Sequence, residues 1–165
     1  MTKDLVVDIN IRGMTPNDLS EPVKVAISKA ACRAWSCAGQ ALNNAEISLL
    51  ITDDWQIRKL NKRYRGIDCP TNVLSFACSC DATSQVDGAP VLLGDIVLGY
   101  GVIAREAKLH KKAFSDHICH LVVHGVLHLA GYDHESIAAA AEMRELEIYI
   151  LDKNGISDPY VNWVD

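Results

Sequence analysis

Four stretches of the chain predict β-strands, and in the first of them apolar and polar residues alternate clearly. The strands are expected at residues 5–12, 46–51, 72–77 and 91–98. In the first stretch, Val7, Ile9 and Ile11 alternate with polar residues, as in a strand with one buried face. Gly94, inside the fourth stretch, indicates a bulge or the close approach of another backbone.

Apolar residues spaced three and four apart predict five helices. The helices are expected at residues 21–37, 54–64, 102–112, 116–130 and 137–153. The expected N-caps are Ser20, Thr52 or Asp53, and Ser115, and the last helix is expected to start near Ser136. The expected helix ends include Gly66, Gly131 and Asn154-Gly155. The order of elements predicts an α+β fold. It would have one mixed four-stranded sheet with about five helices packed on it, in a single domain spanning residues 1–165.

The composition is that of an ordinary globular domain, because 49% of the 165 residues are apolar and 22% are charged. No apolar run is long enough to span a bilayer, and the first residues do not resemble a signal peptide. We therefore expect a cytoplasmic protein without membrane contacts. The six cysteines form no CxxC pair and are expected to be reduced thiols.

The charge distribution limits which part of the protein surface can bind nucleic acid. A net charge of −5 argues against a surface that binds nucleic acid as a whole. Five basic residues nevertheless lie in or next to the second predicted helix: Arg58, Lys59, Lys62, Arg63 and Arg65. A basic run is usually a solvated helix face, but an RNA-binding face is an equally good interpretation here.

The segment His124–His134 carries the strongest chemical signal. His124 and His128 are four residues apart, so they lie on one face of the predicted helix. Gly131 can end that helix, and His134 follows the turn. Three neutral imidazoles that converge make a site for one divalent metal ion. We expect Zn²⁺, with a fourth position open to water because no fourth protein ligand is evident.

Two residues near this segment are candidates to hold a ligand in place. His120 lies on the same helix face as His124 and His128, and it would contact a ligand or line the cleft. Asp133 would accept a hydrogen bond from the second ring nitrogen of a ligand, or would form the turn itself.

The spacing HxxxHxxGxxH is that of the zinc-protease signature HExxHxxGxxH, with Gly125 in place of the glutamate that acts as base. We therefore expect a zincin-like arrangement, with the metal-binding helix central in the fold, but not peptide hydrolysis. Phosphodiester hydrolysis requires a metal and a cation that neutralises the developing charge. Arg65 is the candidate cation, since a guanidinium is a planar two-point donor for phosphate. Arg65 and His124 are the expected catalytic residues.

Several motifs together resemble the YbeY family of bacterial rRNA-maturation endoribonucleases. They are Arg65 with the following glycine, PTNVLSF at residues 70–76, LGDI at 93–96, the segment 124–134, and DPY at 158–160. The resemblance covers the chain from about residue 45 to Tyr160 and departs at Ala77-Cys78, where members often have proline.

This resemblance implies a metal-dependent, single-strand-specific endoribonuclease. It would act on the 3′ end of small-subunit (16S) rRNA and in ribosome quality control. The family's ligands correspond to His124, His128 and His134, and its important arginine to Arg65. The implied partners are single-stranded RNA and the ribosome or its small subunit, without DNA.

Two functions of other kinds stay open. A ribosome-assembly or RNA-binding factor, whose metal only holds the fold, would bind RNA without cleaving it. A metalloprotease-like hydrolase would rest on the histidine spacing alone. For RNA cleavage, the nucleophile is either a metal-activated water or the 2′-hydroxyl of the RNA, and no residue is clearly the general base.

Overall fold

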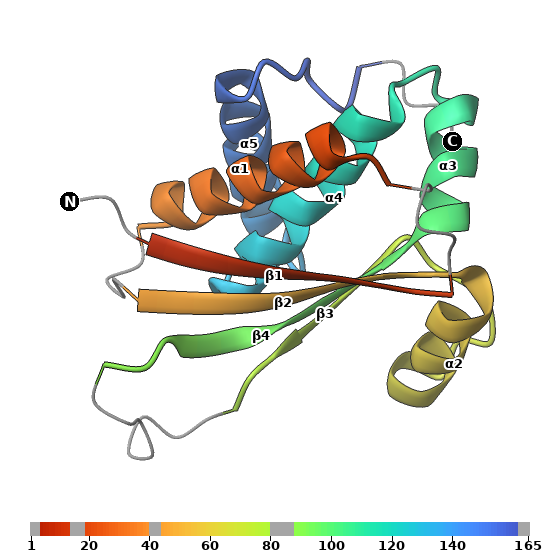
Figure 1. Ribbon diagram of the computed structural model, residues 1–165. Helices are drawn as coiled ribbons and strands as arrows, with labels where there is room; N and C mark the ends of the chain where they lie inside the picture. Colours follow the sequence, from red (N-terminus) through yellow and green to blue (C-terminus); the bar gives the residue numbers. More distant parts are fainter. Residues whose placement is uncertain (1–3, 14–18, 40–43, 80–87, 162–165) are drawn as a thin grey trace.

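The computed structural model describes residues 4–13, 19–39, 44–79 and 88–161, in which four strands form one mixed sheet. The strands are β1 (Asp4–Arg12), β2 (Asn44–Thr52), β3 (Val73–Ala77) and β4 (Val91–Gly99). Their order in the sheet is β1-β2-β4-β3. β1, β2 and β4 are parallel, whereas β3 is antiparallel to β4 and forms one edge of the sheet. The predicted fold class and element order are confirmed (Figure 1).

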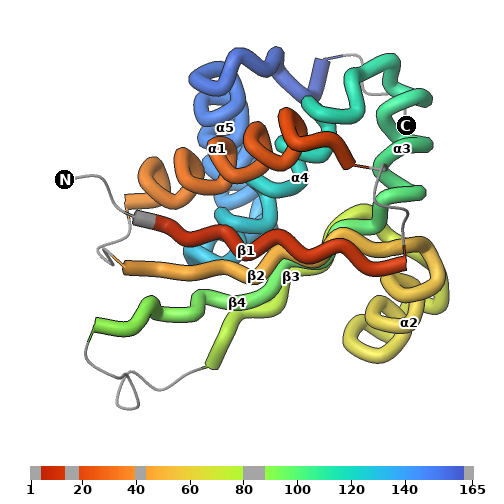
Figure 2. The backbone as a smooth tube through the Cα atoms, viewed as in Figure 1, coloured from red at the N-terminus to blue at the C-terminus, as the bar shows by residue number. Residues whose placement is uncertain are grey.

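Five helices of the described residues cover the sheet unequally (Figures 1 and 2). They are α1 (Glu21–Cys37), α2 (Asp54–Arg65), α3 (Tyr100–Leu109), α4 (Phe114–Leu129) and α5 (Ile137–Lys153). α1 and α4 pack on one face, here called the inner face, with α5 beyond them. α2 lies under one end of the opposite, outer face. None of these helices has the length and apolar composition needed to cross a membrane.

The main core lies between the inner face and the helices that cover it, and α4 is its most enclosed element. Residues 117–123 and 125–127 of α4 are all buried. A smaller cluster of Ile57, Leu74 and Val97 joins α2 to the outer face. Because α4 is so enclosed, a polar side chain on it must find a protein partner or reach a cleft.

Most predicted helix ends are confirmed, because the capping contacts are local. Asp53 Oδ1 accepts a hydrogen bond from the Gln56 amide at 2.9 Å, and Ser136 Oγ accepts one from the Ala139 amide at 3.1 Å. Gly66 ends α2 in the left-handed conformation, with φ 73°.

Two predicted helix boundaries are wrong. α4 begins at Phe114 with Ala113 as its N-cap, not after a Ser115 cap. The aromatic ring of Phe114 packs against Tyr100 with a centroid distance of 5.0 Å, and this tertiary contact draws the helix start forward. α3 ends at Leu109 and not at residue 112, since Lys111 adopts a left-handed backbone with φ 53°.

The predicted irregularity at Gly94 is confirmed. The pairing of β2 with β4 shifts register between Glu46 and Ile47, opposite this part of β4. Gly94 has φ 151°, and a Cβ at this position would collide with the carbonyl oxygen of Phe76. The glycine therefore lets β3 approach β4 closely beside the segment that lines the cleft described below.

The prediction of reduced thiols is wrong at Cys78, which is disulfide-bonded. The prediction rested on the lack of a signal peptide and of a CxxC pair, neither of which decides whether two nearby thiols can be joined. Cys32, Cys37, Cys69 and Cys119 keep their thiols, and Cys80 lies outside the described residues.

Candidate metal centre

α4 crosses β3 and β4 at unusually short range, and Gly125 makes this approach possible. A Cβ built on Gly125 would lie 3.0 Å from Ile96 Cδ1 and 3.1 Å from Ser75 Oγ. A side chain at this position would require Ile96 or Ser75 to shift by a few tenths of an ångström. A glutamate, which the zinc-protease signature has at this position, would therefore begin in close contact with the sheet, and Gly125 relieves that contact.

His124, His128 and His134 converge at the carboxyl end of α4. One ligand-capable atom from each of the three lies within 4.8 Å of the others. His124 Nε2 and His128 Nε2 are 3.0 Å apart, one helical turn from each other. Gly131, with φ 97°, turns the chain back after the helix and brings the exposed His134 to the pair. The structure thus brings together the three residues predicted as ligands.

The hydrogen bonds of the two helical rings fit a metal site. His124 Nδ1 lies 2.6 Å from Glu147 Oε1, and His128 Nδ1 lies 2.9 Å from the carbonyl oxygen of Tyr132. Since both partners are acceptors, each Nδ1 carries the proton and each Nε2 is left with a lone pair. Two lone pairs facing each other at this distance repel unless a cation lies between them. Burial and the neighbouring His124 also lower the pKa of His128, which favours the neutral, metal-binding form.

Glu147 on α5 is the residue that holds His124, and the sequence analysis missed it. Its carboxylate is only 1% exposed and contacts His124 through one oxygen and His120, at 3.3 Å, through the other. Tyr160 donates its hydroxyl to the same Oε2. Burial alone would raise the pKa of Glu147, but hydrogen bonds from His120, His124 and Tyr160 outweigh it and lower the pKa to about 2. The carboxylate is therefore charged at any physiological pH.

One sequence signal could have pointed to Glu147. The buried positions of α5 are Met143, Glu147, Ile150 and Leu151, which follow helical spacing. A carboxylate within such an apolar stripe needs a buried partner, and the histidines of α4 were the available ones. The DPY segment is explained in the same way, because it brings the Tyr160 hydroxyl to this carboxylate.

Neither Asp133 nor His120 contacts one of the three clustered histidines by a hydrogen bond of its side chain. Asp133 Oδ1 accepts from the Glu135 amide at 3.1 Å, so it forms the turn, the alternative interpretation of that residue. The contacts with the second ring nitrogens of His124 and His128 are made by Glu147 and by the Tyr132 carbonyl. His120 lies behind Glu147 and not in the cleft.

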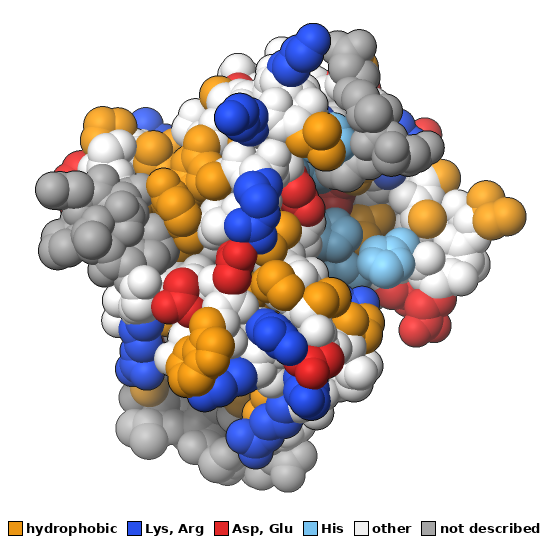
Figure 3. Space-filling model, turned by 90° about the vertical axis from the view of Figure 1, so that its right-hand side faces the viewer, with side chains coloured by type: hydrophobic (Ala, Val, Ile, Leu, Met, Phe, Trp, Pro, Cys, Tyr) orange, Lys and Arg blue, Asp and Glu red, His pale blue; other side chains and the backbone are white. Residues whose placement is uncertain are grey.

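The three histidines open into a cleft of about 600 Å³ along the free edge of β3. The lining residues are Tyr64, Arg65, Val73, Leu74, Ser75, Phe76, Ala77, His124, His128, Leu129 and His134. Figure 3 shows histidine side chains in a hollow of this face, with Lys and Arg side chains gathered lower down. Arg65, predicted as the catalytic cation, thus lines the same cleft as the predicted ligands. The cleft has room for a phosphodiester and its neighbouring nucleotides.

The other basic residues of α2 lie along the helix outside the cleft. Arg58 and Lys62 both pair with Asp68, each at 2.8 Å. Lys59 Nζ lies 3.1 Å from the centre of the exposed Trp55 ring. These exposed contacts are weak enough to exchange for a phosphate. The predicted RNA-binding residues therefore form a basic face that is continuous with Arg65, not a part of the metal centre itself.

Part of the PTNVLSF motif is structural. Asn72 Nδ2 donates to Glu106 at 3.2 Å, and Asn72 Oδ1 accepts from the Val73 amide at 2.7 Å. The Gly99 amide donates to the Asn72 carbonyl at 2.9 Å. These bonds fix the start of β3 against β4 and α3, which sets the line of the cleft wall. The sequence alone did not separate this role from a catalytic one.

Comparisons with known proteins identify the family of the chain. A model of the family described as Endoribonuclease YbeY matches residues 16–155. A protein of that name from Bradyrhizobium sp. (strain BTAi1) is 47% identical over 146 residues, 88% of this chain and 84% of that one. Another of that name, from Rhodospirillum rubrum, is 55% identical over 119 residues, 71% of this chain and 59% of that one. The solution structure of TM1509 from Thermotoga maritima is similar to this structure, with a TM-score of 0.54 and 21% sequence identity. The match spans 94% of this chain and 99% of that one, and it supports the fold. The chain therefore belongs to the family described as Endoribonuclease YbeY.

Proposed function

We propose that the protein is a metal-dependent endoribonuclease that hydrolyses phosphodiester bonds of single-stranded RNA. The observation that carries the proposal is the presence of three convergent histidines and Arg65 in one cleft. The family name, which is that of an endoribonuclease, supports the reaction class. The basic face of α2, with Arg58, Lys59, Lys62 and Arg63 beside Arg65, supports a polyanionic substrate.

His124, His128 and His134 would hold the metal, for which zinc is the best match to three imidazoles. Such an ion, when bound, supplies a Lewis acid for a phosphoryl oxygen and a hydroxide at neutral pH. Arg65 binds the scissile phosphate and neutralises charge that develops on its oxygens. Glu147 holds the His124 ring with Nε2 toward the cleft, and the Tyr132 carbonyl does the same for His128.

Specific features argue against the two other functions. A structural metal is normally enclosed by four protein ligands, whereas this histidine cluster has three and lines an open cleft. A metalloprotease needs a base next to the metal, and the position of that base is Gly125, packed against Ser75 and Ile96. Phosphodiester cleavage would instead draw its hydroxide from water bound to the metal, and the metal and the Arg65 guanidinium would stabilise the alkoxide leaving group.

The proposed substrate within the cell is small-subunit (16S) rRNA, at its 3′ end, with a role in ribosome quality control in the cytoplasm. This part rests on the family resemblance, and the basic face of α2 is compatible with contacts to the small subunit. The protein would then meet its substrate on the ribosome or its small subunit.

The test is cleavage of a single-stranded RNA by purified wild type and the folded variant His124→Ala. Wild type loaded with zinc should cleave, and the variant should lose at least about 100-fold of the rate, since losing a ligand exceeds the cost of losing its hydrogen-bond partner. Products with 5′-phosphate ends would indicate attack by water, and 2′,3′-cyclic phosphate ends would indicate the 2′-hydroxyl. Equal cleavage by the two proteins would contradict the proposal.

A further inference from the structure

A second hollow lies on the outer face of the sheet, next to the cleft. Its volume is about 350 Å³, and it is lined by Ser48, Leu50, Leu60, Tyr64, Phe76, Asp95 and Val97. The floor is apolar and formed by the strands, while α2 closes one side. The metal centre does not use this hollow, and the sequence analysis assigned it no role.

Two aromatic residues separate the hollow from the cleft. Tyr64 and Phe76 line both, and their rings pack at a centroid distance of 4.9 Å and an angle of 58°. Tyr64 is 56% exposed, a large value for an aromatic side chain without a partner protein. The hollow and the candidate active site are therefore neighbours that share one wall, formed by the rings of Tyr64 and Phe76.

Polar groups stand at defined positions around the apolar floor. Asp95 is paired with Ser48 on β2 and with Phe76 on β3, so the three side chains lie side by side on the outer face. Asp95 is exposed and Ser48 is half-buried. The arrangement combines a flat ring, a carboxylate acceptor and a hydroxyl.

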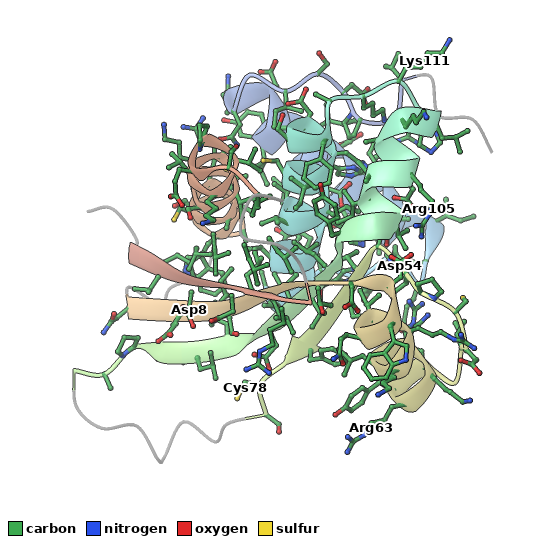
Figure 4. The ribbon with its side chains drawn as sticks, turned by 45° about the vertical axis from the view of Figure 1, so that its right-hand side comes forward. Asp8, Asp54, Arg63, Cys78, Arg105 and Lys111 are labelled. Atoms are coloured by element: carbon green, nitrogen blue, oxygen red, sulfur yellow. The ribbon has the colours of Figure 1, made fainter. Side chains whose placement is uncertain are left out.

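The charges around the hollow decide which part of an RNA it can accept. The Arg63 guanidinium lies 5.2 Å from the centre of the Tyr64 ring, and Arg65 lies on the cleft side of the same ring. Figure 4 shows Arg63 at the lower end of α2, on the side of the sheet that also carries Asp8. Phosphates would stay with these arginines, because the Asp95 carboxylate repels them. The hollow itself suits an uncharged group with N–H donors.

We propose that this hollow is a nucleobase site that receives the base next to the scissile phosphate of a single-stranded RNA. The inference rests on the proposed function and adds a recognition element to it. The base stacks on Tyr64, and Asp95 accepts a hydrogen bond from an exocyclic amino group. Cytosine, adenine and guanine carry such a group, whereas uracil presents carbonyl oxygens there. A paired base cannot enter the hollow, and this gives a physical origin for single-strand specificity.

The test measures binding of short oligocytidylate and oligouridylate of equal length to the zinc-loaded protein, at one salt concentration. Wild type should bind oligocytidylate about 5-fold to 10-fold more tightly, the effect of one good base contact. Asp95→Ala should abolish this preference. Asp8→Ala, a matched control on the same face outside the hollow, should keep it. Tyr64→Ala should weaken binding of both RNAs about 10-fold, and Tyr64→Phe should restore it, since stacking needs only the ring.

Equal binding of the two RNAs by wild type, no binding of either, or a preference that survives in Asp95→Ala would each overturn the proposal. Cleavage is recorded in parallel and separates the two ideas. Cleavage without a base preference would leave the endoribonuclease standing and remove the base site. A base preference without cleavage would leave the base site standing and remove the endoribonuclease.

Discussion

α4 carries a histidine–carboxylate pair near each end. The two pairs differ in the exposure of the histidine and in the ring nitrogen that contacts the carboxylate. Near the start, His117 Nε2 lies 2.7 Å from Glu106 Oε2, and the histidine side chain is fully enclosed. Near the end, His124 Nδ1 lies 2.6 Å from Glu147 Oε1, and the histidine side chain is 25% exposed at the cleft. The two contacts have nearly the same length and the same chemistry.

The two histidines contact their carboxylates through different ring nitrogens. His124 meets its carboxylate through Nδ1, which turns Nε2 toward two further imidazoles. His117 meets its carboxylate through Nε2, and the pair links α4 to α3 inside the protein. A carboxylate that holds a histidine ring could therefore serve a metal site only where the other ring nitrogen reaches a cleft.

The largest effect should separate the two ends of α4. His128→Ala removes a ligand and should reduce bound zinc to well below one ion per chain, with cleavage slowed at least about 100-fold. His117→Ala should lower the melting temperature, because Glu106 loses its buried partner, but leave the zinc content unchanged. Metal analysis by mass spectrometry and a cleavage assay measure both. Loss of zinc from a folded His117→Ala protein would contradict the distinction.

The next effect should fall on catalysis alone. Arg65→Ala should slow cleavage about 100-fold with the zinc content unchanged, as expected for loss of one group that stabilises developing charge. Arg58→Ala is the matched control, because Arg58 is on the same helix but is paired with Asp68 outside the cleft. It should change the rate little. Similar losses in the two variants would mean that the basic helix acts only by general attraction.

A smaller effect should show that Glu147 acts through His124. Glu147→Gln removes the charge behind the ligand and should weaken zinc affinity about 10-fold to 100-fold. Glu106→Gln makes the same change in the His117–Glu106 pair and should leave zinc affinity unaltered while reducing stability. Competition with a chromophoric zinc chelator measures the affinities. Equal affinities in the two variants would remove the proposed positioning role.

The smallest effect at neutral pH is the effect of Glu147 on the stability of the fold. It becomes measurable when the pH is lowered. The pKa of Glu147 is lowered to about 2 from an ordinary value of 4.5, so its charged form stabilises the fold above pH 4.5 and this stabilisation is lost as the pH falls toward 2. The full contribution is on the order of 3 kcal/mol. Burial also lowers the pKa of His120, which adds a loss of stability below about pH 6.5. Calorimetry of the metal-free protein should show a smaller acid-induced loss for Glu147→Gln, and identical losses would contradict this account.

The success of the sequence analysis depended on how local each feature is. His124 and His128 are one turn apart on one helix, so their geometry follows from spacing, and Asp53 and Gly66 act on neighbouring residues. Glu147 is 23 residues from His124, and only the packing of α5 on α4 brings them together. For the same reason the sequence left two interpretations of Asp133 open, and the structure shows the turn contact: sequence proximity to a ligand does not give the direction of a side chain.

Packing also explains the features that the sequence showed without their cause. Gly125 was visible as a missing base, but its contacts with Ser75 and Ile96 belong to the crossing of α4 over the sheet. The Tyr64–Phe76 wall joins α2 to β3 and has no signature in either segment alone.

The central claim is that cleavage requires one metal ion held by His124, His128 and His134. Its most direct test is a titration of metal-free protein with zinc while the cleavage of a single-stranded RNA is recorded. The account predicts no cleavage without metal, a rise in rate with added zinc, and a plateau at one ion per chain. Cleavage at the full rate by metal-free protein would contradict it.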